Sequence, residues 1–339
     1  MHITMLGTGY VGLVSGACFS EFGFQVCCVD KNQDKIDNLK NNIMPIYEPG
    51  LESLVIKNKE AGRLTFSNNI DKEIQKADII FIAVGTPTRR GDGHADLTYV
   101  YEAAEKIAKN LNGYTVIVTK STVPVGTGIE VKKIIEKINP NANFDIASNP
   151  EFLREGNAIE DFMRPDRVVV GIENNKAKEI ISSIYKPLFL IETPILFTDL
   201  KTAELIKYSA NAFLAVKISF INQMADLCEK VGADVHDVAR GMGLDKRIGS
   251  KFLHPGPGYG GSCFPKDTLA LIQTAKLYDT DISIVETVVQ YNQKRKSDMA
   301  NKIIKIFNGK TENKKISILG LAFKPGTDDM RDSPALDII

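Results

Sequence analysis

The sequence lacks a long apolar run, an excess of charge of either sign and any Cys-x-x-Cys pair. Because no segment approaches the roughly 20 apolar residues that cross a bilayer, we expect no membrane-spanning helix. The 42 basic residues balance 42 acidic ones, so no net field draws the chain onto nucleic acid or an anionic membrane. The N-terminus shows no secretory signal pattern, and we therefore expect a cytoplasmic protein with neither nucleic acid nor membrane as partner.

The cysteines form an odd set without metal-ligand spacing, which disfavours both a disulfide framework and a zinc site. They are Cys18, Cys27, Cys28, Cys228 and Cys263. The four histidines have no obvious partners in the sequence, so we assign no catalytic histidine and expect no metal. One cysteine, Cys263, needs a different explanation from the others.

The 339 residues are long enough for two or more hydrophobic cores. Through the first half, short apolar runs alternate with amphipathic stretches, a pattern typical of a parallel sheet covered by helices on both faces. The expected strands are Ile3–Leu6, Gln25–Val29, Leu64–Phe66, Ile79–Val84, Val116–Thr119, Asp145–Ala147 and Val168–Val170. We predict an α/β fold whose first domain, residues 1–199, is doubly wound and Rossmann-like.

From Leu200 the pattern changes to a long helical run without proline, which predicts a connecting helix and packing surface. Further helices are expected at 234–242, 267–278 and 283–307, so residues 200–309 are predicted to form a helical central domain. The apolar run Lys315–Leu319 predicts a returning strand, and Ser333 and Pro334 predict the start of a helix. One strand and part of a helix cannot bury a core. We therefore expect residues 310–339 to begin a second Rossmann-like domain that is incomplete in this chain.

A glycine-rich turn directly follows the first predicted strand and opens a helical pattern. Its residues are Gly7, Thr8, Gly9, Tyr10, Val11 and Gly12. Such glycines give a tight turn and let the backbone approach a pyrophosphate at a helix N-terminus. Asp30 closes the second strand, where a carboxylate binds the ribose hydroxyls and repels a 2′-phosphate, and Lys35 is expected near the same ribose. The pattern favours NAD over NADP; FAD, or a glycine-rich turn that binds nothing, are the weaker alternatives.

Five further blocks extend the pattern over nearly the whole chain. They are Val84-Gly85-Thr86-Pro87-Thr88, Ser121-Thr122-Val123-Pro124-Val125-Gly126, Asn149-Pro150-Glu151-Phe152-Leu153-Arg154-Glu155-Gly156, Gly260-Gly261-Ser262-Cys263-Phe264-Pro265-Lys266-Asp267 and Phe323-Lys324-Pro325-Gly326-Thr327-Asp328-Asp329-Met330-Arg331. In this order they resemble the UDP-glucose 6-dehydrogenase family. The resemblance implies NAD as cofactor, UDP-glucose as substrate and UDP-glucuronate as product.

Cys263 lies in a glycine-rich segment, with Lys266 three residues away. A nearby cation favours the thiolate, which is the reactive form. The other four cysteines fall in helix or strand patterns, where packing as small apolar residues explains them. The resemblance implies that Cys263 captures the aldehyde as a thiohemiacetal and carries a thioester after a second hydride transfer, before hydrolysis releases the acid.

Lys207 and Asn211 stand four residues apart on the long helix and therefore share a face. Both can donate hydrogen bonds to an oxygen that carries negative charge during the reaction. The alternative without a catalytic role is that Lys207 is a solvated surface lysine and Asn211 an interior polar residue with a local hydrogen-bond partner. Asp267 is the candidate base, acting through water, and Glu151 the candidate for activating the hydrolytic water beside Thr122. The sequence leaves the division of these roles open.

The resemblance also implies binding residues. For NAD, besides the glycine-rich turn, Asp30 and Lys35, these are Thr86, Thr122, Glu155, Lys266 and Arg331. For the sugar and diphosphate they are Glu151, Phe152, Leu153, Arg154, Glu155, Lys207, Asn211, Arg247, Phe252, Leu253, His254, Pro255, Gly256, Tyr259, Gly260, Phe323 and Lys324. Lysine and arginine suit a diphosphate because they stay charged at physiological pH. The resemblance further implies a homodimer built on the long helix that starts near Leu200, with Arg247 reaching into the neighbour's site.

Three alternatives remain. The first is a dehydrogenase of GDP-mannose or UDP-N-acetylmannosamine with the same chemistry, although segments 161–171 and 252–260 look closer to the UDP-glucose branch. The second is a non-catalytic nucleotide-binding module on the same fold. The third is a hydroxyacid dehydrogenase with a single oxidation step, which would not require Cys263.

Overall fold

The computed structural model describes residues 1–89 and 91–339. The chain forms two compact units. The first comprises Met1–Arg89 and Ala95–Lys207. The second comprises the residues from Tyr208 to Ile339 and a short stretch ending at His94.

The first unit is built on one sheet of eight strands in the order β3-β2-β1-β4-β5-β6-β7-β8. The strands are β1 (His2–Leu6), β2 (Gln25–Val29), β3 (Leu64–Ser67), β4 (Ile79–Ile82), β5 (Tyr114–Thr119), β6 (Asn143–Ser148), β7 (Val168–Ile172) and β8 (Ile195–Thr198). All neighbouring pairs are parallel except β6 and β7, which are antiparallel. The seven expected strands are confirmed as β1 to β7. The expected parallel pairing holds for all of them except β6 with β7, and β8 was not predicted.

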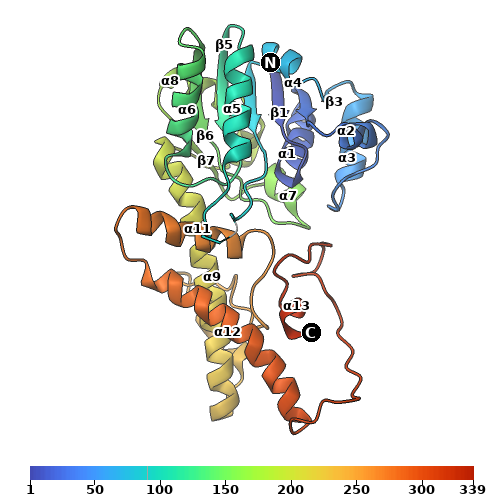
Figure 1. The fold of residues 1–339 in the computed structure, drawn as a ribbon, viewed down its shortest axis with the longest axis vertical. Helices are drawn as coiled ribbons and strands as arrows, with labels where there is room; N and C mark the ends of the chain where they lie inside the picture. The colour runs from blue at the N-terminus through green and yellow to red at the C-terminus, as the bar shows by residue number, and fades with distance from the viewer. Residues whose placement is uncertain (90) are drawn as a thin grey trace. The chain divides into compact units, whose positions relative to one another are not determined.

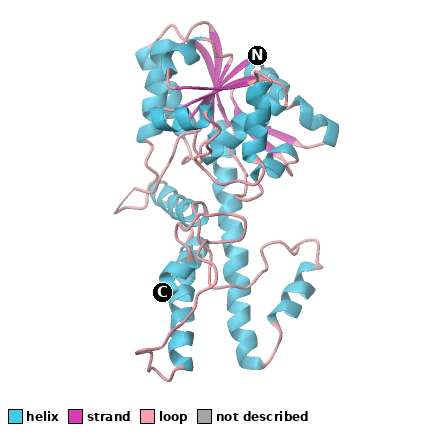
Figure 2. Cartoon of the chain, turned by 90° about the vertical axis from the view of Figure 1, so that its right-hand side faces the viewer, coloured by secondary structure: helices cyan, strands magenta, loops and turns pink. Residues whose placement is uncertain are grey.

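Helices cover both faces of this sheet, as the strands between helices in Figure 2 show. They are α1 (Tyr10–Glu21), α2 (Gln33–Lys40), α3 (Leu51–Glu60), α4 (Ile70–Gln75), α5 (Thr98–Asn110), α6 (Thr127–Ile138), α7 (Ala158–Met163), α8 (Asn175–Ile184) and the short 3₁₀ helix η1 (Lys186–Ile191). Successive residues of β4 alternate between two apolar cores: Phe81 packs with α1 and α7, and Ile82 packs with α5 and α6. Because side chains alternate across a strand, such continuously apolar strands need cover on both sides.

The second unit is helical. Its elements are the greater part of α9 (Leu200–Val231), α10 (Val235–Gly243), α11 (Phe264–Leu277), α12 (Ser283–Ile306) and α13 (Pro334–Ile338) (Figure 1). Buried residues of α9, α11 and α12, among them Ala212, Leu271 and Val285, form its main apolar cluster. In the described part of the chain no helix is long and apolar enough to cross a membrane.

The predicted strand Lys315–Leu319 was wrong, because these residues form neither helix nor strand. Ile316, Ile318 and Leu319 are exposed. A strand is stable only with a neighbour that accepts its backbone hydrogen bonds, and the described residues of this region provide none. The helix start was confirmed: Ser333 caps α13 and Pro334 is its first residue.

Candidate active site

The carboxyl ends of the parallel strands bring five predicted segments to one edge of the sheet in the first unit. The glycine-rich turn follows β1, Asp30 follows β2, Thr86 follows β4, Thr122 follows β5 and Glu151 follows β6. In open α/β sheets this edge, at the point where the strand order reverses, is where ligands bind. Here the order reverses between β1 and β4.

The glycine-rich turn is shaped for close approach of a ligand. Gly7 has a φ of +105°, and a Cβ there would lie 2.5 Å from the Ala83 carbonyl oxygen; a Cβ on Gly12 would lie 2.0 Å from the Gly7 carbonyl oxygen. At Gly9, by contrast, a Cβ would meet no atom of the described residues within 4 Å. The turn thus leaves open space directly before α1, whose first N–H groups are available for the pyrophosphate of a dinucleotide.

Asp30 is held as a carboxylate beside this turn. Its Oδ2 accepts hydrogen bonds from Thr8 N (3.1 Å) and Thr8 Oγ1 (2.7 Å), its Oδ1 accepts one from Asn32 N (3.0 Å), and Lys35 Nζ lies 3.8 Å away. Burial alone would raise the pKa of Asp30, but these donors and the lysine hold it below its ordinary value. An ionised acceptor at the end of β2 suits the ribose hydroxyls of NAD and disfavours a 2′-phosphate.

The side chain of Tyr10 is turned toward the protein. Its hydroxyl donates to Glu48, a buried carboxylate that also accepts from Gly156 N (2.7 Å) and Ala158 N (2.8 Å). Burial, followed by the Glu48 contact, raises the pKa of Tyr10. Tyr10 and Gly156 therefore share Glu48 as a hydrogen-bond acceptor, which links the start of α1 to the segment that carries Glu155 and Gly156. Glu48 was not predicted, since no motif surrounds it.

The segments after β4 and β5 are joined side by side. Thr86 Oγ1 donates to the Thr122 carbonyl oxygen (2.9 Å), and Ser121 Oγ donates to the Val84 carbonyl oxygen (2.7 Å). The two predicted threonines, which are 36 positions apart in sequence, therefore belong to one surface of the first unit.

Glu151 and Lys207 form a buried ion pair. Lys207 Nζ lies 3.3 Å from Glu151 Oε1, and their side chains are only 4% and 7% exposed. Leu153 N donates to Glu151 Oε2 at 2.5 Å. The ammonium also lies 5.2 Å from the centre of the Phe152 ring. A solvated surface lysine is thus the wrong interpretation of Lys207, because a buried charge needs a partner of this kind.

Lys120 is a residue that sequence reasoning missed, although it directly precedes the Ser121–Gly126 block. It is buried at the end of β5, where its Nζ donates to Asn149 Oδ1 (3.0 Å) and to the Tyr185 hydroxyl (3.4 Å). Lys120 and Glu151 both line a cavity of about 40 Å³. Burial lowers the pKa of Lys120 to about 8, against the opposing effect of Glu151. A second titratable cation therefore lies close to the Glu151–Lys207 pair.

In the second unit, Asp267 is the centre of a polar cluster. It is 1% exposed, and its carboxylate accepts hydrogen bonds from Asn211 Nδ2 (2.6 Å) and Lys266 Nζ (2.6 Å). Its backbone N–H donates to the Cys263 carbonyl oxygen (2.8 Å). Asp267 thus connects α9 with the first turn of α11, and the Asn211 amide is paired with a candidate catalytic carboxylate 56 positions away in the sequence.

Cys263 is the N-cap residue of α11, and its Sγ lies 3.6 Å from Ser262 Oγ. It is partly exposed, whereas Cys18, Cys27, Cys28 and Cys228 are buried. Burial raises the pKa of Cys18 and Cys28, and that of Cys27 to about 11, so these thiols stay protonated. A thiol at a helix N-terminus with access to solvent has the surroundings of a reactive cysteine.

The predicted cationic residues are found in ion pairs or over aromatic rings. Arg154 pairs with Asp161, Arg331 with Asp329 (2.8 Å) and Arg247 with Asp245 (2.6 Å). Lys324 Nζ lies 5.4 Å from the centre of the Phe323 ring. The Arg247 side chain is 89% exposed and contacts only its own turn among the interactions described. Within residues 1–89 and 91–339 no group of three His, Cys, Asp or Glu side chains could hold a metal ion.

A doubly wound sheet with an open glycine turn and an ionised Asp30 is typical of the NAD-binding domain of an oxidoreductase. Comparison with known families agrees. Residues 1–189 match the NAD binding domain of the UDP-glucose/GDP-mannose dehydrogenase family, residues 201–294 its central domain and residues 317–339 its UDP binding domain. The chain belongs to this family, and its cofactor is NAD, so both predictions are confirmed.

Individual relatives extend the similarity to the whole chain. A UDP-glucose 6-dehydrogenase of Rhizobium meliloti (strain 1021) is 60% identical over 341 residues, covering 100% of this chain and 78% of the relative. A solved UDP-glucose dehydrogenase from Pyrobaculum islandicum is 38% identical, with a TM-score of 0.94 over 99% of this chain and 78% of that one. A UDP-D-ManNAc dehydrogenase from Pyrococcus horikoshii is 26% identical, with a TM-score of 0.89 over 100% and 80%.

Proposed function

We propose that this protein oxidises UDP-glucose to UDP-glucuronate with two NAD per substrate, through a covalent intermediate on Cys263. The observation that carries the proposal is the part-exposed Cys263 at the N-terminus of α11 in an NAD-dependent dehydrogenase. The choice of UDP-glucose is supported by the 60% identity to a relative of that activity, against 26% to a UDP-D-ManNAc dehydrogenase.

The need for a nucleophile follows from the chemistry. Oxidation of the primary alcohol removes a hydride and a proton and leaves an aldehyde that could escape. Addition of the Cys263 thiol to the aldehyde carbon forms a thiohemiacetal, which loses a second hydride and a proton to give a thioester. Water then adds to the thioester carbon, the C–S bond breaks, and the acid and the thiol are released. NAD, when bound, would supply the acceptor for the hydride released in each of the two oxidations.

The surrounding residues have proposed roles that fit their environments. Lys207 and Asn211, both on α9, donate hydrogen bonds to the oxygen that becomes negative in the oxidation and hydrolysis steps. Asp267, fully buried and hydrogen-bonded by Asn211, accepts the alcohol proton through water. Glu151 activates the hydrolytic water with Thr122. Lys207 Nζ lies 3.3 Å from Glu151 Oε1, so the proposed hydrogen-bond donor and the proposed base lie next to each other.

The experiment is a count of NADH produced per nucleotide sugar consumed, with UDP-glucose, GDP-mannose and UDP-N-acetylmannosamine as parallel substrates. We expect two NADH per UDP-glucose, an acid as product and much lower rates with the other two sugars. One NADH per UDP-glucose with release of the aldehyde would overturn the covalent mechanism. Preference for another sugar would overturn the substrate assignment alone.

A homodimer is the second part of the proposal. Phe213, Phe220, Leu227 and Val231 are exposed on α9, and their spacing of seven, seven and four residues places them on one side of the helix. An exposed apolar stripe of this length favours a protein partner, and the resemblance implies a second copy. Light scattering should give a dimer for the wild type and a monomer for Phe220→Glu. A monomeric wild type would contradict this part.

A further inference from the structure

The segment Pro255–Gly261, which leads to Cys263, forms neither helix nor strand. Four of its seven residues are glycine, which would leave an isolated segment highly flexible. Three buried side chains nevertheless hold its backbone: Asn222 from α9, and Asn292 and Arg295 from α12. Side chains thus replace the hydrogen-bond partners that regular structure would have supplied.

Two positions of the segment are held at both their donor and their acceptor. Gly256 N donates to Asn222 Oδ1 (2.8 Å), and the Gly256 carbonyl oxygen accepts from Arg295 Nε (3.0 Å). Tyr259 N donates to Asn292 Oδ1 (2.8 Å), and its carbonyl oxygen accepts from Asn292 Nδ2 (3.0 Å). Between them Gly258 has a φ of +127° and comes so close to α12 that a Cβ would lie 3.0 Å from Asn292 Oδ1.

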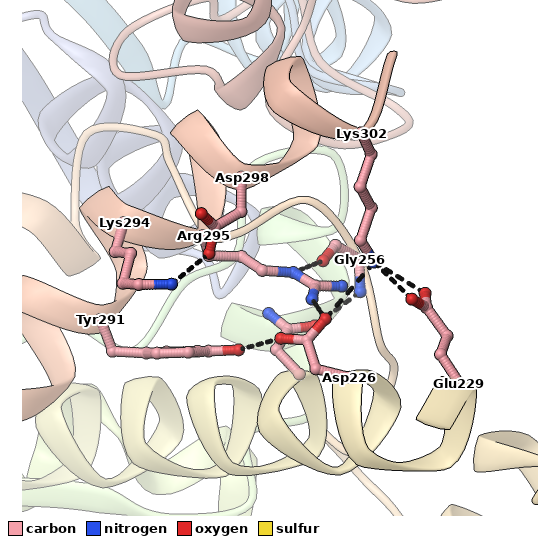
Figure 3. Close-up of polar contacts among 9 residues, drawn as sticks. Asp226, Glu229, Gly256, Tyr291, Lys294, Arg295, Asp298 and Lys302 are labelled. Atoms are coloured by element: carbon pink, nitrogen blue, oxygen red, sulfur yellow. Dashed lines mark hydrogen bonds and ion pairs between the residues drawn. The ribbon is translucent and has the colours of Figure 1, made fainter. Parts of the chain in front are cut away.

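Arg295 is itself oriented by an ion pair between α12 and α9. Its guanidinium donates to Asp226, whose other contacts are the Tyr291 hydroxyl (3.1 Å) and Lys302 Nζ (3.4 Å), as Figure 3 shows. Arg295 is only 6% exposed. The Nε–H that reaches Gly256 is separate from the NH1 group that binds Asp226. One planar guanidinium therefore holds the carboxylate on one side and the backbone carbonyl on the other.

The segment is coupled to Cys263 by aromatic packing. The Tyr259 ring meets the Phe264 ring edge to face, with centroids 5.9 Å apart. Phe264 follows Cys263 directly and is the first residue of α11. Gly261 N is also fixed, by a hydrogen bond to the Arg331 carbonyl oxygen (2.8 Å). A shift of the backbone at Gly256–Tyr259 would consequently be transmitted to the position of the Cys263 thiol.

We propose that Arg295, oriented by Asp226, is a positioning residue of the dehydrogenase: it holds the Gly256–Tyr259 backbone in the geometry that presents Cys263 to the nucleotide sugar. The part of this inference that concerns the sugar rests on the proposed function. The physical reason is that a reacting group must be held to within a fraction of an ångström, which a glycine-rich segment cannot do alone. The competing interpretation is an ion pair that only joins α9 to α12.

The test compares three variants of the whole chain: Arg295→Met, Arg295→Lys and, as a matched control, Lys294→Met. Lys294 is adjacent to Arg295 on α12 and forms an exposed ion pair with Asp298, which Lys294→Met removes. Among the interactions described, Lys294 makes none with the segment Pro255–Gly261. The first readout is the rate of Cys263 alkylation by iodoacetamide, followed by peptide mass spectrometry. The second is the KM for UDP-glucose beside the KM for NAD.

We expect Arg295→Met to change the alkylation rate of Cys263 at least threefold and to raise the KM for UDP-glucose while the KM for NAD stays unchanged. Arg295→Lys keeps a cation for Asp226 but cannot serve both partners, so it should give an intermediate result. Lys294→Met should match the wild type. Asp226→Asn retains the arginine but removes the charge that orients it, so it serves as the second variant if Arg295→Met does not fold. It should alter alkylation in the same direction.

Wild-type alkylation in folded Arg295→Met and Asp226→Asn would overturn the inference and leave a purely structural ion pair. Equal losses in Arg295→Met and Lys294→Met would overturn it as well. Alkylation requires neither NAD nor sugar, so this readout decides the positioning role even if the wild type does not oxidise UDP-glucose. Failure of the proposed function would appear instead as a wrong number of NADH per UDP-glucose, or none.

Discussion

Lys207 Nζ lies 3.3 Å from Glu151 Oε1, although 56 residues separate the two along the chain and both side chains are almost fully buried. Neither charge has bulk water to stabilise it, so each depends on the other. The pair joins the first turns of α9 to the segment that follows β6. In the proposed hydrolysis, Glu151 of this pair accepts the proton of the attacking water.

The first prediction concerns Glu151→Gln. We expect hydrolysis to slow by about 10² or more, because general-base catalysis contributes on that order. The oxidation steps should continue until the enzyme is loaded, giving a burst of NADH and a UDP-glucuronyl thioester on Cys263 that intact-mass analysis of quenched enzyme detects. A variant that turns over steadily with no adduct would show that Glu151 does not serve hydrolysis.

The second prediction is that Lys120 makes the free energy of unfolding depend on pH. Burial lowers its pKa from 10.5 to about 8, so between pH 8 and 10.5 the unfolded chain carries a proton that the folded protein has lost. Unfolding therefore takes up a proton, and stability should rise with pH across this window. Lys120→Met removes the titrating group, so the rise should be absent from its chemical-denaturation series.

The control for this prediction is Lys109→Met on α5, a lysine whose side chain is 59% exposed. It should retain the pH dependence of the wild type. Identical slopes for Lys120→Met and the wild type between pH 8 and 10.5 would mean that Lys120 titrates as an ordinary lysine.

Asp30 determines the third prediction. Asp30→Ala removes the ionised acceptor beside Thr8, and we expect NAD binding to weaken by about tenfold or more, since hydrogen bonds to charged groups contribute roughly 1.5–3 kcal/mol. Binding of NADP should improve relative to NAD because the charge that repels a 2′-phosphate is gone. Titration calorimetry with both cofactors measures the ratio. Asp34→Ala, on the exposed surface of α2, should leave it unchanged, and an unaltered ratio in Asp30→Ala would exclude Asp30 from the ribose site.

Asp267 gives the fourth prediction. Asp267→Asn keeps the shape of the side chain but removes the charge that pairs with Lys266, so the first hydride transfer should slow by about 10² or more. Pre-steady-state measurement of NADH formation isolates that step. A normal first burst with slow later turnover would assign Asp267 to hydrolysis instead.

Much of the fold could be predicted because it depends on local patterns. The continuous apolar strands and the glycine turn were found since each carries its periodicity or motif within a few residues. β8 was missed because it is a short edge strand of four residues that follows a proline. Lys315–Leu319 has the composition of a strand yet forms none, because a strand depends on a neighbour that composition does not reveal.

The candidate site was likewise predictable only in part. Motif residues such as Cys263 and Glu151 were recognisable, but the residues that hold them were not. Lys120, Glu48 and Arg295 act through contacts with backbone or side chains at least 29 positions away. Such contacts leave no periodic trace in the sequence, and a buried lysine or arginine looks like a surface residue until its partners are known.

The most direct test of the central claim is the activity of Cys263→Ser measured with UDP-glucose and NAD, with folding checked by the unfolding temperature. We predict that the formation of UDP-glucuronate falls by at least about 10³, because the serine hydroxyl is a far weaker nucleophile at neutral pH. Formation of the acid with two NADH per UDP-glucose at the wild-type rate would contradict the account.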